Sequence, residues 1–494
     1  MSLGLRILVL LLAPLLAVLL GLAARRPRFS EYVNLAASVV ALLVAAPLPF
    51  AAGLPATLLD GYLIVDPLGA WVAMCVAVVY LLSSIYAIGY MRREVHRQAQ
   101  LPAFYALLAG FALTMLAAPL VNSIGVYWIA IELTTLVSTF LVGFERNAES
   151  MEAAWKYIIV VSSGISLALL GTALLYWGGT FVYGETYRLT WASLVQAAPH
   201  MPPVLLKLGF LLTLIGYGTK VGLAPMHTWL PDAHSEGPAP VSAMLSGALL
   251  NTAMLGIVRF LAATDAAGQG ARMPHAALVV LGVLSLLVGA LFIVRQTQIK
   301  RLMAYSSVEH MGVLALGFGF GGPLGIAGAL YHMINHSLAK PLLFFGAGNA
   351  MQRYGSKRIA DLRDVWRTFP VSGALWLCGA EAITGAPPFG LFLSEFTILR
   401  AGWTTPHLWA AIVMLVLLIV IFVGFLNHFR VMYLASPDRA PTDRQLHGAA
   451  HWHAPWRVLP MVLPMVPLLL LGVWWPAAWT ALFRTIARAL GAGP

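Results

Sequence analysis

Apolar residues form runs that recur from one end of the chain to the other, separated by short polar segments. Each run holds about 20 residues, the length that an α-helix needs to cross the hydrocarbon core of a membrane. We therefore predict an all-α, polytopic transmembrane bundle of about fourteen helices, without a soluble domain. The first run is too long for the apolar core of a signal peptide and is interpreted as the first span. The expected spans have these approximate limits: 4–23, 33–53, 66–90, 101–120, 123–143, 156–178, 204–224, 240–262, 275–294, 301–320, 323–351, 370–402, 406–432 and 457–482.

Proline interrupts the seventh and the twelfth of these predicted spans. In the seventh, Pro225 comes shortly after Lys220, and in the twelfth, Pro387 and Pro388 come shortly before Glu395. Broken helices at matching places in two halves of a membrane protein are typical of inverted repeats with a site near mid-membrane. Within one membrane domain (1–494), we expect three N-terminal helices in 1–98, a first inverted repeat in 101–262, a second in 275–432 and a C-terminal helix in 457–482.

The composition agrees with a membrane protein, because 60% of the residues are hydrophobic and only 10% are charged. The net charge of +11 could indicate nucleic-acid binding, but the basic residues cluster in short loops between the spans. Such clustering is the positive-inside pattern, so we predict no nucleic-acid partner. On this basis the basic loops lie in the cytoplasm, both termini lie outside, and the chain is a multi-pass protein of the cell (inner) membrane. The basic clusters are 25–28, 92–97, 295–301, 353–367 and 430–457.

Residues that usually hold metals and redox centres are few or poorly placed. Only Cys75 and Cys378 occur, both inside apolar runs, and they form no CxxC pair and no set for an iron–sulfur cluster. We therefore expect no cofactor and no metal bound by this chain. Three histidines, which we interpret as solvated, lie in the longest polar loop: His447, His451 and His453.

Ionisable residues inside the predicted spans are the best candidates for function. Such a residue costs roughly 2.5–3.5 kcal/mol at mid-membrane, and it usually faces the bundle interior and serves ion or proton transfer. Glu132 lies near the centre of the fifth span, and Lys220 lies in the seventh. The alternatives are a structural carboxylate hydrogen-bonded to a neighbouring helix, and a lysine that reaches toward the membrane surface. The chain stays apolar after Lys220, which favours a buried amine.

A second group lies in the eleventh predicted span. His332, His336 and Lys340 recur at every fourth position and therefore fall on one face of a helix. A file of imidazoles can relay protons, because imidazole titrates near neutral pH. Two other interpretations are helix–helix hydrogen bonding and a zinc site, but neither a third ligand nor a nearby HExxH pattern supports zinc. Glu309 and His310, in the preceding span, could stand beside the two histidines.

Three more candidates belong to the broken spans. Glu395 follows the double proline of the twelfth span, and a carboxylate at a helix end near the membrane surface is the alternative interpretation. His227 and Asp232 lie in the proline-broken stretch after Lys220, and we expect them to support it.

Four segments carry a resemblance to a known family: "KVGLAPMHTWLPDAHSEGPAPVSA", "KRLMAYSSVEHMG", "NHSLAKPLLFF" and "GAPPFGLFLSEF". They resemble the antiporter-like subunits of respiratory complex I, of Mrp-type sodium/proton antiporters and of membrane-bound hydrogenases, over residues 100–430. Within that family, "DAHSE", "MLSGALLN" and "SSVEHMG" are most similar to component F of the hydrogenase-4 and formate hydrogenlyase type.

The resemblance implies a fold of fourteen helices with two inverted five-helix repeats. It places the family's transmembrane glutamate on Glu132, its partner lysine on Lys220, and the charged residue of the broken twelfth helix on Glu395. The eleventh-helix group falls on His332, His336 and Lys340. Many relatives carry an ionisable residue on the eighth helix, where this chain has Asn251, which cannot itself titrate.

The function that these observations predict is proton translocation in a redox-driven membrane complex. Burial disfavours the charged form of Lys220 and a nearby carboxylate favours it, so moving either partner would load or release a proton. The redox centres, nickel–iron and iron–sulfur, are expected in partner subunits, namely other membrane subunits and a peripheral redox arm. Two alternatives stay open: a Na⁺/H⁺ antiporter subunit without redox chemistry, and an ion-coupling subunit of an inorganic-carbon uptake complex.

Overall fold

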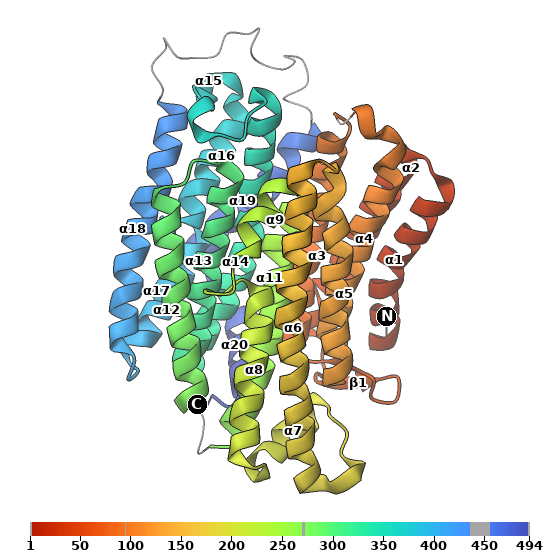
Figure 1. Cartoon of the computed structure of the whole chain (residues 1–494), viewed down its shortest axis with the longest axis vertical. Helices are drawn as coiled ribbons and strands as arrows, with labels where there is room; N and C mark the ends of the chain where they lie inside the picture. Colours follow the sequence, from red (N-terminus) through yellow and green to blue (C-terminus); the bar gives the residue numbers. More distant parts are fainter. Residues whose placement is uncertain (1, 94, 269–271, 435–454, 493–494) are drawn as a thin grey trace.

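The computed structural model describes residues 2–93, 95–268, 272–434 and 455–492. In this part of the chain, long helices stand side by side in an upright bundle (Figure 1). The histidines of the long polar loop lie outside the described residues. The α-helices are α1 (Leu3–Ala24), α2 (Pro27–Ala45), α3 (Pro67–Met91), α4 (Leu101–Ala117), α5 (Ile124–Val142), α6 (Ala148–Tyr183), α7 (Trp191–Ala197), α8 (Pro203–Val221), α9 (Trp229–Glu236), α10 (Ala239–Met244), α11 (Leu250–Ala266), α12 (Arg272–Val294), α13 (Ile299–Phe320), α14 (Gly322–Tyr354), α15 (Val365–Thr368), α16 (Pro370–Ile383), α17 (Gly390–Trp403), α18 (Leu408–Tyr433), α19 (Pro455–Val473) and α20 (Ala477–Ala489).

Shorter elements connect these helices. The strands β1 (Ala56–Leu58) and β2 (Leu63–Val65) pair antiparallel in a small hairpin. A π-helix, η7 (Leu245–Leu249), lies between α10 and α11. The 3₁₀ helices are η1 (Leu48–Phe50), η2 (Val95–Gln100), η3 (Ala118–Leu120), η4 (Gly143–Glu145), η5 (Gly184–Thr186), η6 (Ala198–His200) and η8 (Ile359–Asp361).

The predicted all-α membrane bundle is confirmed. Among the described residues, 11 helical segments are long and apolar enough to cross a membrane. The helices α13 and α14 are also long, at 22 and 33 residues, but they hold buried polar and charged side chains. The outer surface is apolar, since Phe140, Leu291 and Val423 are each 60% exposed or more. The division into inverted repeats stays a prediction.

The predicted breaks in the seventh and twelfth spans are present. Helix α8 ends at Val221, Gly222 follows with a positive φ of 81°, and the chain becomes helical again at α9. At this break the indole of Trp229 donates to the carbonyl of Thr219 at 2.8 Å, and the amide of Ala224 donates to the Ser285 hydroxyl at 2.9 Å. Helix α16 ends before the double proline, and α17 begins after it. These two backbone groups at the first break are thus satisfied by side chains inside the protein, as a membrane interior requires.

Several expected boundaries were wrong. Helix α2 begins at Pro27 rather than at 33, because proline suits the first turn of a helix. Helix α6 begins at Ala148 rather than at 156, where Asn147 and Ser150 form a capping box. The expected C-terminal helix over 457–482 is two helices, α19 and α20, and α20 begins directly after Pro476.

Small residues bring α6 and α8 close together, and this packing positions Lys220. A Cβ atom at Gly164 of α6 would lie 2.5 Å from Thr219 of α8, and one at Gly216 would lie 2.5 Å from Ala168. Small residues at helix interfaces permit such close approach in membranes. The side chains at the end of α8 are therefore held against α6.

Both ends of the chain lie in the lower half of the view in Figure 1, where β1 and α7 also lie. The segment around α15, which belongs to a basic cluster, lies at the upper end. This arrangement agrees with two termini on one side of the membrane, opposite basic loops. That this side is the outside stays a prediction.

Candidate functional site

Lys220 lies in the last turn of α8, at the break in the seventh span. Its side chain is fully buried, and Nζ donates hydrogen bonds to the hydroxyls of Thr135 (2.9 Å) and Tyr157 (2.8 Å). A lysine that reached for the membrane surface would expose its amine. The burial of Nζ therefore argues against that interpretation and places a cation inside the bundle.

Glu132, on α5, is partly buried and reaches Lys220 through a hydroxyl. Its Oε1 accepts a hydrogen bond from Ser162 at 2.5 Å, and its Oε2 accepts one from Thr135 at 3.4 Å. Thr135 also accepts from Lys220, and a hydroxyl can donate and accept at once. Among the ion pairs of the described residues, none joins Glu132 directly to Lys220. The expected pair is therefore bridged by Thr135.

Helix α9 continues from this pair toward the second half of the chain. The ring of Tyr157 lies 4.7 Å from that of Trp229, the first residue of α9. His234, on the same helix, is fully buried and stacks on Phe344 of α14 at 5.1 Å. Neither ring nitrogen of His234 has a hydrogen-bond partner among the described residues. An unpartnered buried imidazole next to α14 is a candidate connection between the two halves.

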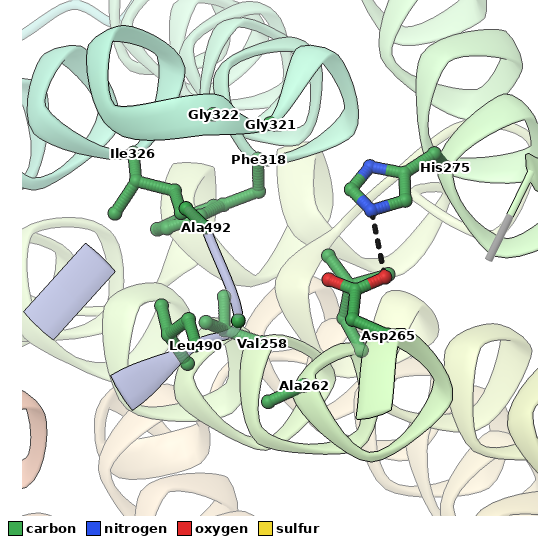
Figure 2. Close-up of a pocket in the computed structure, with 12 residues that line it drawn as sticks. Val258, Ala262, Asp265, His275, Phe318, Gly321, Gly322, Ile326, Leu490 and Ala492 are labelled. Carbon is green, nitrogen blue, oxygen red and sulfur yellow. Dashed lines mark hydrogen bonds and ion pairs between the residues drawn. The ribbon is translucent and has the colours of Figure 1, made fainter. Parts of the chain in front are cut away.

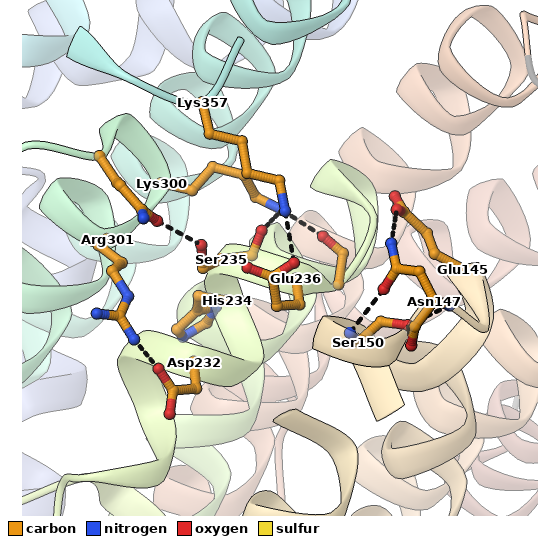
Figure 3. A network of polar contacts seen from close by, with 12 residues as sticks. Glu145, Asn147, Ser150, Asp232, His234, Ser235, Glu236, Lys300, Arg301 and Lys357 are labelled. Atoms are coloured by element: carbon orange, nitrogen blue, oxygen red, sulfur yellow. Dashed lines mark hydrogen bonds and ion pairs between the residues drawn. The ribbon is translucent and has the colours of Figure 1, made fainter. Parts of the chain in front are cut away.

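The end of α9 is fixed by lysines from two other segments (Figure 3). Lys300, at the start of α13, is buried and donates to the carbonyls of Ser235, at 3.1 Å, and Gly237. Lys357 forms an ion pair with Glu236 at 2.5 Å. Because α9 follows a broken stretch, these contacts hold it in place against α13.

The supporting candidates Asp232 and His227 lie at the edge of this arrangement. Asp232 forms ion pairs with Arg301 and, at 3.4 Å, with Lys156. These two cations favour an anchoring role for Asp232 rather than a place among the buried ionisable residues inside the bundle. The ring of His227 lies 6.3 Å from that of Tyr305, and its Nδ1 has no hydrogen-bond partner among the described residues.

Asn251, on α11, provides a polar position between the halves. It is fully buried, and its Nδ2 donates to the Ser337 hydroxyl at 3.0 Å and to the Gly247 carbonyl at 3.3 Å. Its Oδ1 has no partner among the described residues. Ser246, five residues before Asn251, lies within the π-helix η7. Its hydroxyl lies 2.7 Å from the hydroxyl of Ser307 on α13. Such π-helical turns are frequent at functional sites.

The predicted group on α14 lies inside the bundle. His332, His336 and Lys340 are all fully buried, and the two imidazole rings lie 6.4 Å apart. Lys340 Nζ donates to Ser306 Oγ at 2.5 Å and to the carbonyl of Met303 at 3.1 Å, both on α13. Neither ring nitrogen of His336 has a partner in the described part of the chain.

Helices α13 and α17 complete this second cluster. Nδ1 of His310 lies 3.1 Å from Nε2 of His332, and Nε2 of His310 lies 3.4 Å from the Glu309 carboxylate. Nδ1 of His332 lies 2.9 Å from the Ser394 hydroxyl. Glu395, the next residue, is only 6% exposed, and its Oε1 has no partner among the described residues. This burial argues against an interfacial carboxylate.

Several residues that join the candidates were not singled out from the sequence. Thr135 lies one helical turn after Glu132, so its spacing could have revealed it. The others come from different helices, and only the fold brings them to the site: Tyr157, Ser162, His234, Ser306 and Ser394.

A separate cavity of about 270 Å³ lies where the ends of α11, α13 and α20 meet (Figure 2). His275 lines it and bridges the Gly319 carbonyl (2.8 Å) and the Asp265 carboxylate (2.9 Å). None of the candidate residues named above lines this cavity. It is therefore not part of the buried file.

The fold and the buried ionisable residues together define a class: multi-span membrane subunits with a polar file through an apolar bundle. The chain belongs to the NADH:quinone oxidoreductase/Mrp antiporter transmembrane family, whose model matches residues 122–421. It is thus an antiporter-like membrane subunit, and the resemblance seen in the sequence is confirmed.

Two relatives agree with this assignment, and one solved structure shares the fold. The chain is 43% identical over 312 residues to the hydrogenase-4 component F homolog of Methylacidiphilum infernorum (isolate V4), covering 62% of this chain and 64% of that relative. It is 32% identical over 405 residues to NADH-quinone oxidoreductase subunit N of Halorhodospira halophila (strain DSM 244 / SL1), covering 81% of each. Its fold matches a chain of the membrane-bound sulfane sulfur reductase, an archaeal respiratory membrane complex, with a TM-score of 0.84 and 21% identity over 99% of this chain and 97% of that chain.

Proposed function

We propose that this chain is the proton-translocating membrane subunit of a redox-driven complex of the membrane-bound hydrogenase type. The observation that carries the proposal is a file of buried ionisable residues between Lys220 on α8 and Glu395 on α17. The partly buried Glu132 of α5 is linked to Lys220 through Thr135. Ionisable residues inside a membrane bundle mark ion or proton pathways. The similarity to a relative named hydrogenase-4 component F homolog favours the hydrogenase type. The nickel–iron and iron–sulfur centres belong to partner subunits in this proposal.

The proposed mechanism begins at Lys220. Its amine is held by the hydroxyls of Thr135 and Tyr157, and Thr135 links it to the carboxylate of Glu132. A small shift of α5 breaks this bridge, which leaves a buried cation without its anion and favours release of a proton. His234 then offers an unpartnered imidazole beside α14. The break after α8 gives the end of this helix room to move.

The second half passes the proton onward in the same proposal. Lys340 receives it beside Ser306, and the imidazoles of His310 and His332 lie in hydrogen-bond distance of each other. A chain of imidazoles can hand on a proton because each ring can donate from one nitrogen and accept at the other. Glu395 is the last buried carboxylate of the file.

The test of this proposal is the variant Glu395→Gln. We expect it to assemble and to reduce proton translocation, because the amide has the same shape but cannot carry a proton. The complex, purified through a tag on this chain and reconstituted in proteoliposomes, would be followed with a pH-sensitive dye during turnover. Glu381→Gln is the matched control, since Glu381 lies on the neighbouring α16, outside the file. Unchanged acidification in Glu395→Gln would remove Glu395 from the pathway, and a strict need for a Na⁺ gradient would favour the antiporter alternative.

A second variant tests the position between the halves. We expect Asn251→Leu to slow proton translocation several-fold, because it removes the amide that binds Ser337 and the free Oδ1 that can hold a water. Asn251→Lys should fold, since the resemblance implies that relatives accept a lysine at this position. Both would be measured in the same proteoliposome assay at matched turnover. Normal translocation by Asn251→Leu would show that the pathway does not pass α11 at this position.

A further inference from the structure

Three potential metal ligands converge where α13, α14 and α17 meet. His310, His332 and Glu395 each offer one donor atom, and these atoms lie within 4.8 Å of one another. All three residues are buried, with exposed fractions of 0%, 0% and 6%. Two imidazoles and one carboxylate are a ligand set that Zn²⁺ uses when one coordination position stays open.

The two imidazoles already have the orientation that a shared metal ion needs. Nε2 of His310 faces the Glu309 carboxylate at 3.4 Å, and Nδ1 of His332 faces the Ser394 hydroxyl at 2.9 Å. The remaining nitrogens, Nδ1 of His310 and Nε2 of His332, face each other at 3.1 Å. Metal-ligating histidines typically bond their outer nitrogen to a carboxylate or another polar group. The His332 ring does so through Ser394, and the Glu309 carboxylate lies near the outer nitrogen of His310.

The distances agree with tetrahedral coordination after small movements. Two nitrogens bound at about 2.0–2.1 Å to a tetrahedral ion lie about 3.3–3.4 Å apart, slightly further than the two facing nitrogens are now, at 3.1 Å. Glu395 supplies a buried oxygen, Oε1, that has no hydrogen-bond partner among the described residues. Glu395 is thus a third potential ligand beside His310 and His332, and the sequence did not reveal it.

The local charges can support a divalent ion. The carboxylates of Glu309 and Glu395 offset its charge, whereas Lys340, which lies within electrostatic reach of His310 and His332, opposes it. Imidazole nitrogen suits Zn²⁺, Co²⁺ and Ni²⁺ rather than Na⁺, Mg²⁺ or Ca²⁺, which prefer oxygen. The site therefore fits a transition metal and not the alkali cation of an antiporter.

We propose that His310, His332 and Glu395 form a binding site for a divalent transition-metal ion of the Zn²⁺ class, and that the bound ion stops proton transfer through the second half of the file. The ion takes the two nitrogens that face each other, so no proton can pass between these imidazoles. It also takes the carboxylate of Glu395. The binding site stands on its own geometry, whereas the inhibition of proton transfer by the bound ion rests on the proposed proton-translocating function.

Binding is tested with Co²⁺, which accepts the same ligands and has visible absorption bands that are strong in tetrahedral sites. The whole complex, purified through a tag without histidines and washed with a chelator, would be titrated with Co²⁺. We expect visible bands that Zn²⁺ removes and that are lost in His310→Ala and Glu395→Gln. His227→Ala is the matched control and should keep them, because His227 lies outside the cluster. Bands of equal intensity in wild type and Glu395→Gln, or no bands in wild type, would overturn the proposed site.

A further variant separates ligation from a structural role. Glu395→Cys should bind Co²⁺ and add an intense near-ultraviolet thiolate-to-metal band, which a residue that only supports the fold would not produce. Absence of this band in an assembled Glu395→Cys complex would contradict ligation by position 395.

The inhibition of proton transfer by the bound ion is tested separately in proteoliposomes. We expect Zn²⁺ to lower wild-type proton translocation by at least about tenfold, since removing a positioned proton carrier typically costs about 10²–10⁴-fold. If Zn²⁺ displaces Co²⁺ but proton translocation continues unchanged, the proposed inhibition is wrong, whereas the proposed binding site is still supported. If the metal-free complex moves no protons during turnover, the proposed function fails, while the Co²⁺ spectra still decide the site.

Discussion

Replacement of Lys220 by methionine should abolish most proton-coupled activity, leaving about a tenth of the wild-type rate or less. Methionine keeps the volume of the buried side chain but removes the amine that binds Thr135 and Tyr157. The hydroxyl of Thr135 then has no cation to connect to Glu132. The complex should still assemble, because the close contacts between α6 and α8 involve glycine and small side chains rather than Lys220.

Arginine at this position should fail as well. The guanidinium group does not release its proton at accessible pH, so Lys220→Arg keeps the charge but cannot switch it. Glu132→Gln should also lose most activity, because it removes the anion at the other end of the Thr135 bridge. The double variant Glu132→Gln with Lys220→Met should lose little more activity than the more impaired single variant, since the losses are not additive when two residues act as a unit.

The experiment is a double-mutant cycle on proton translocation at matched turnover. Lys207→Met is the matched control, because Lys207 lies on the same helix and is exposed. It should translocate protons normally. Additive losses in the cycle, or a working Lys220→Arg variant, would show that Lys220 is not a switching carrier linked to Glu132. Assembly would be followed by co-purification of the partner subunits.

The membrane bundle and its two breaks could be predicted because their causes are local. Apolar runs of the right length specify spans, and Pro225 and the Pro387–Pro388 pair lie where helices are interrupted, since proline lacks the N–H that a helix interior uses. Helix ends were less predictable, because they depend on capping and on residues outside the apolar run. Asn147 caps α6 before its apolar stretch begins, and the C-terminal span breaks near Pro476 although both sides are helical.

The ionisable residues of the candidate site could be predicted from the sequence, but the hydrogen bonds that join them between helices could not. A charge inside an apolar run is visible in one segment, whereas a hydrogen bond between helices depends on how those helices pack. Tyr157 reaches Lys220 because glycines let α6 approach α8, and Ser394 reaches His332 because α17 packs on α14. His234 was not singled out because nothing in its own segment shows that it is buried against α14.

The same reasoning explains why the metal ligands proposed from the structure differ from the pair His332 and His336 that the sequence suggested for zinc. The sequence pairs His332 with His336, because they share a face of one helix. The fold instead pairs His332 with His310 of α13, at 3.1 Å, and brings Glu395 to both. The ligands therefore come from three helices, and helical spacing alone could not have identified them.

Lys340→Met should stop proton translocation as completely as Lys220→Met, to about a tenth of the wild-type rate or less. Lys340 is fully buried, and its amine binds Ser306 Oγ and the carbonyl of Met303. Methionine removes this carrier without leaving Ser306 unsatisfied, because its hydroxyl also donates to the Met303 carbonyl at 3.0 Å. The fold should therefore tolerate the change, and the loss should come from the pathway.

Two further variants show whether Lys340 acts in series with the first half. Ser306→Ala, which only removes the positioning hydroxyl, should cause a smaller loss than Lys340→Met. His332→Ala with His336→Ala should also slow transfer, since the file loses two imidazoles. The double variant Lys220→Met with Lys340→Met should be no worse than either single variant, because a path blocked at one point loses nothing more at a second. Lys156→Met, at an exposed lysine, is the control and should translocate protons normally. If the double variant loses the product of the two single losses, or if Lys340→Met translocates normally, the two lysines do not serve one continuous path.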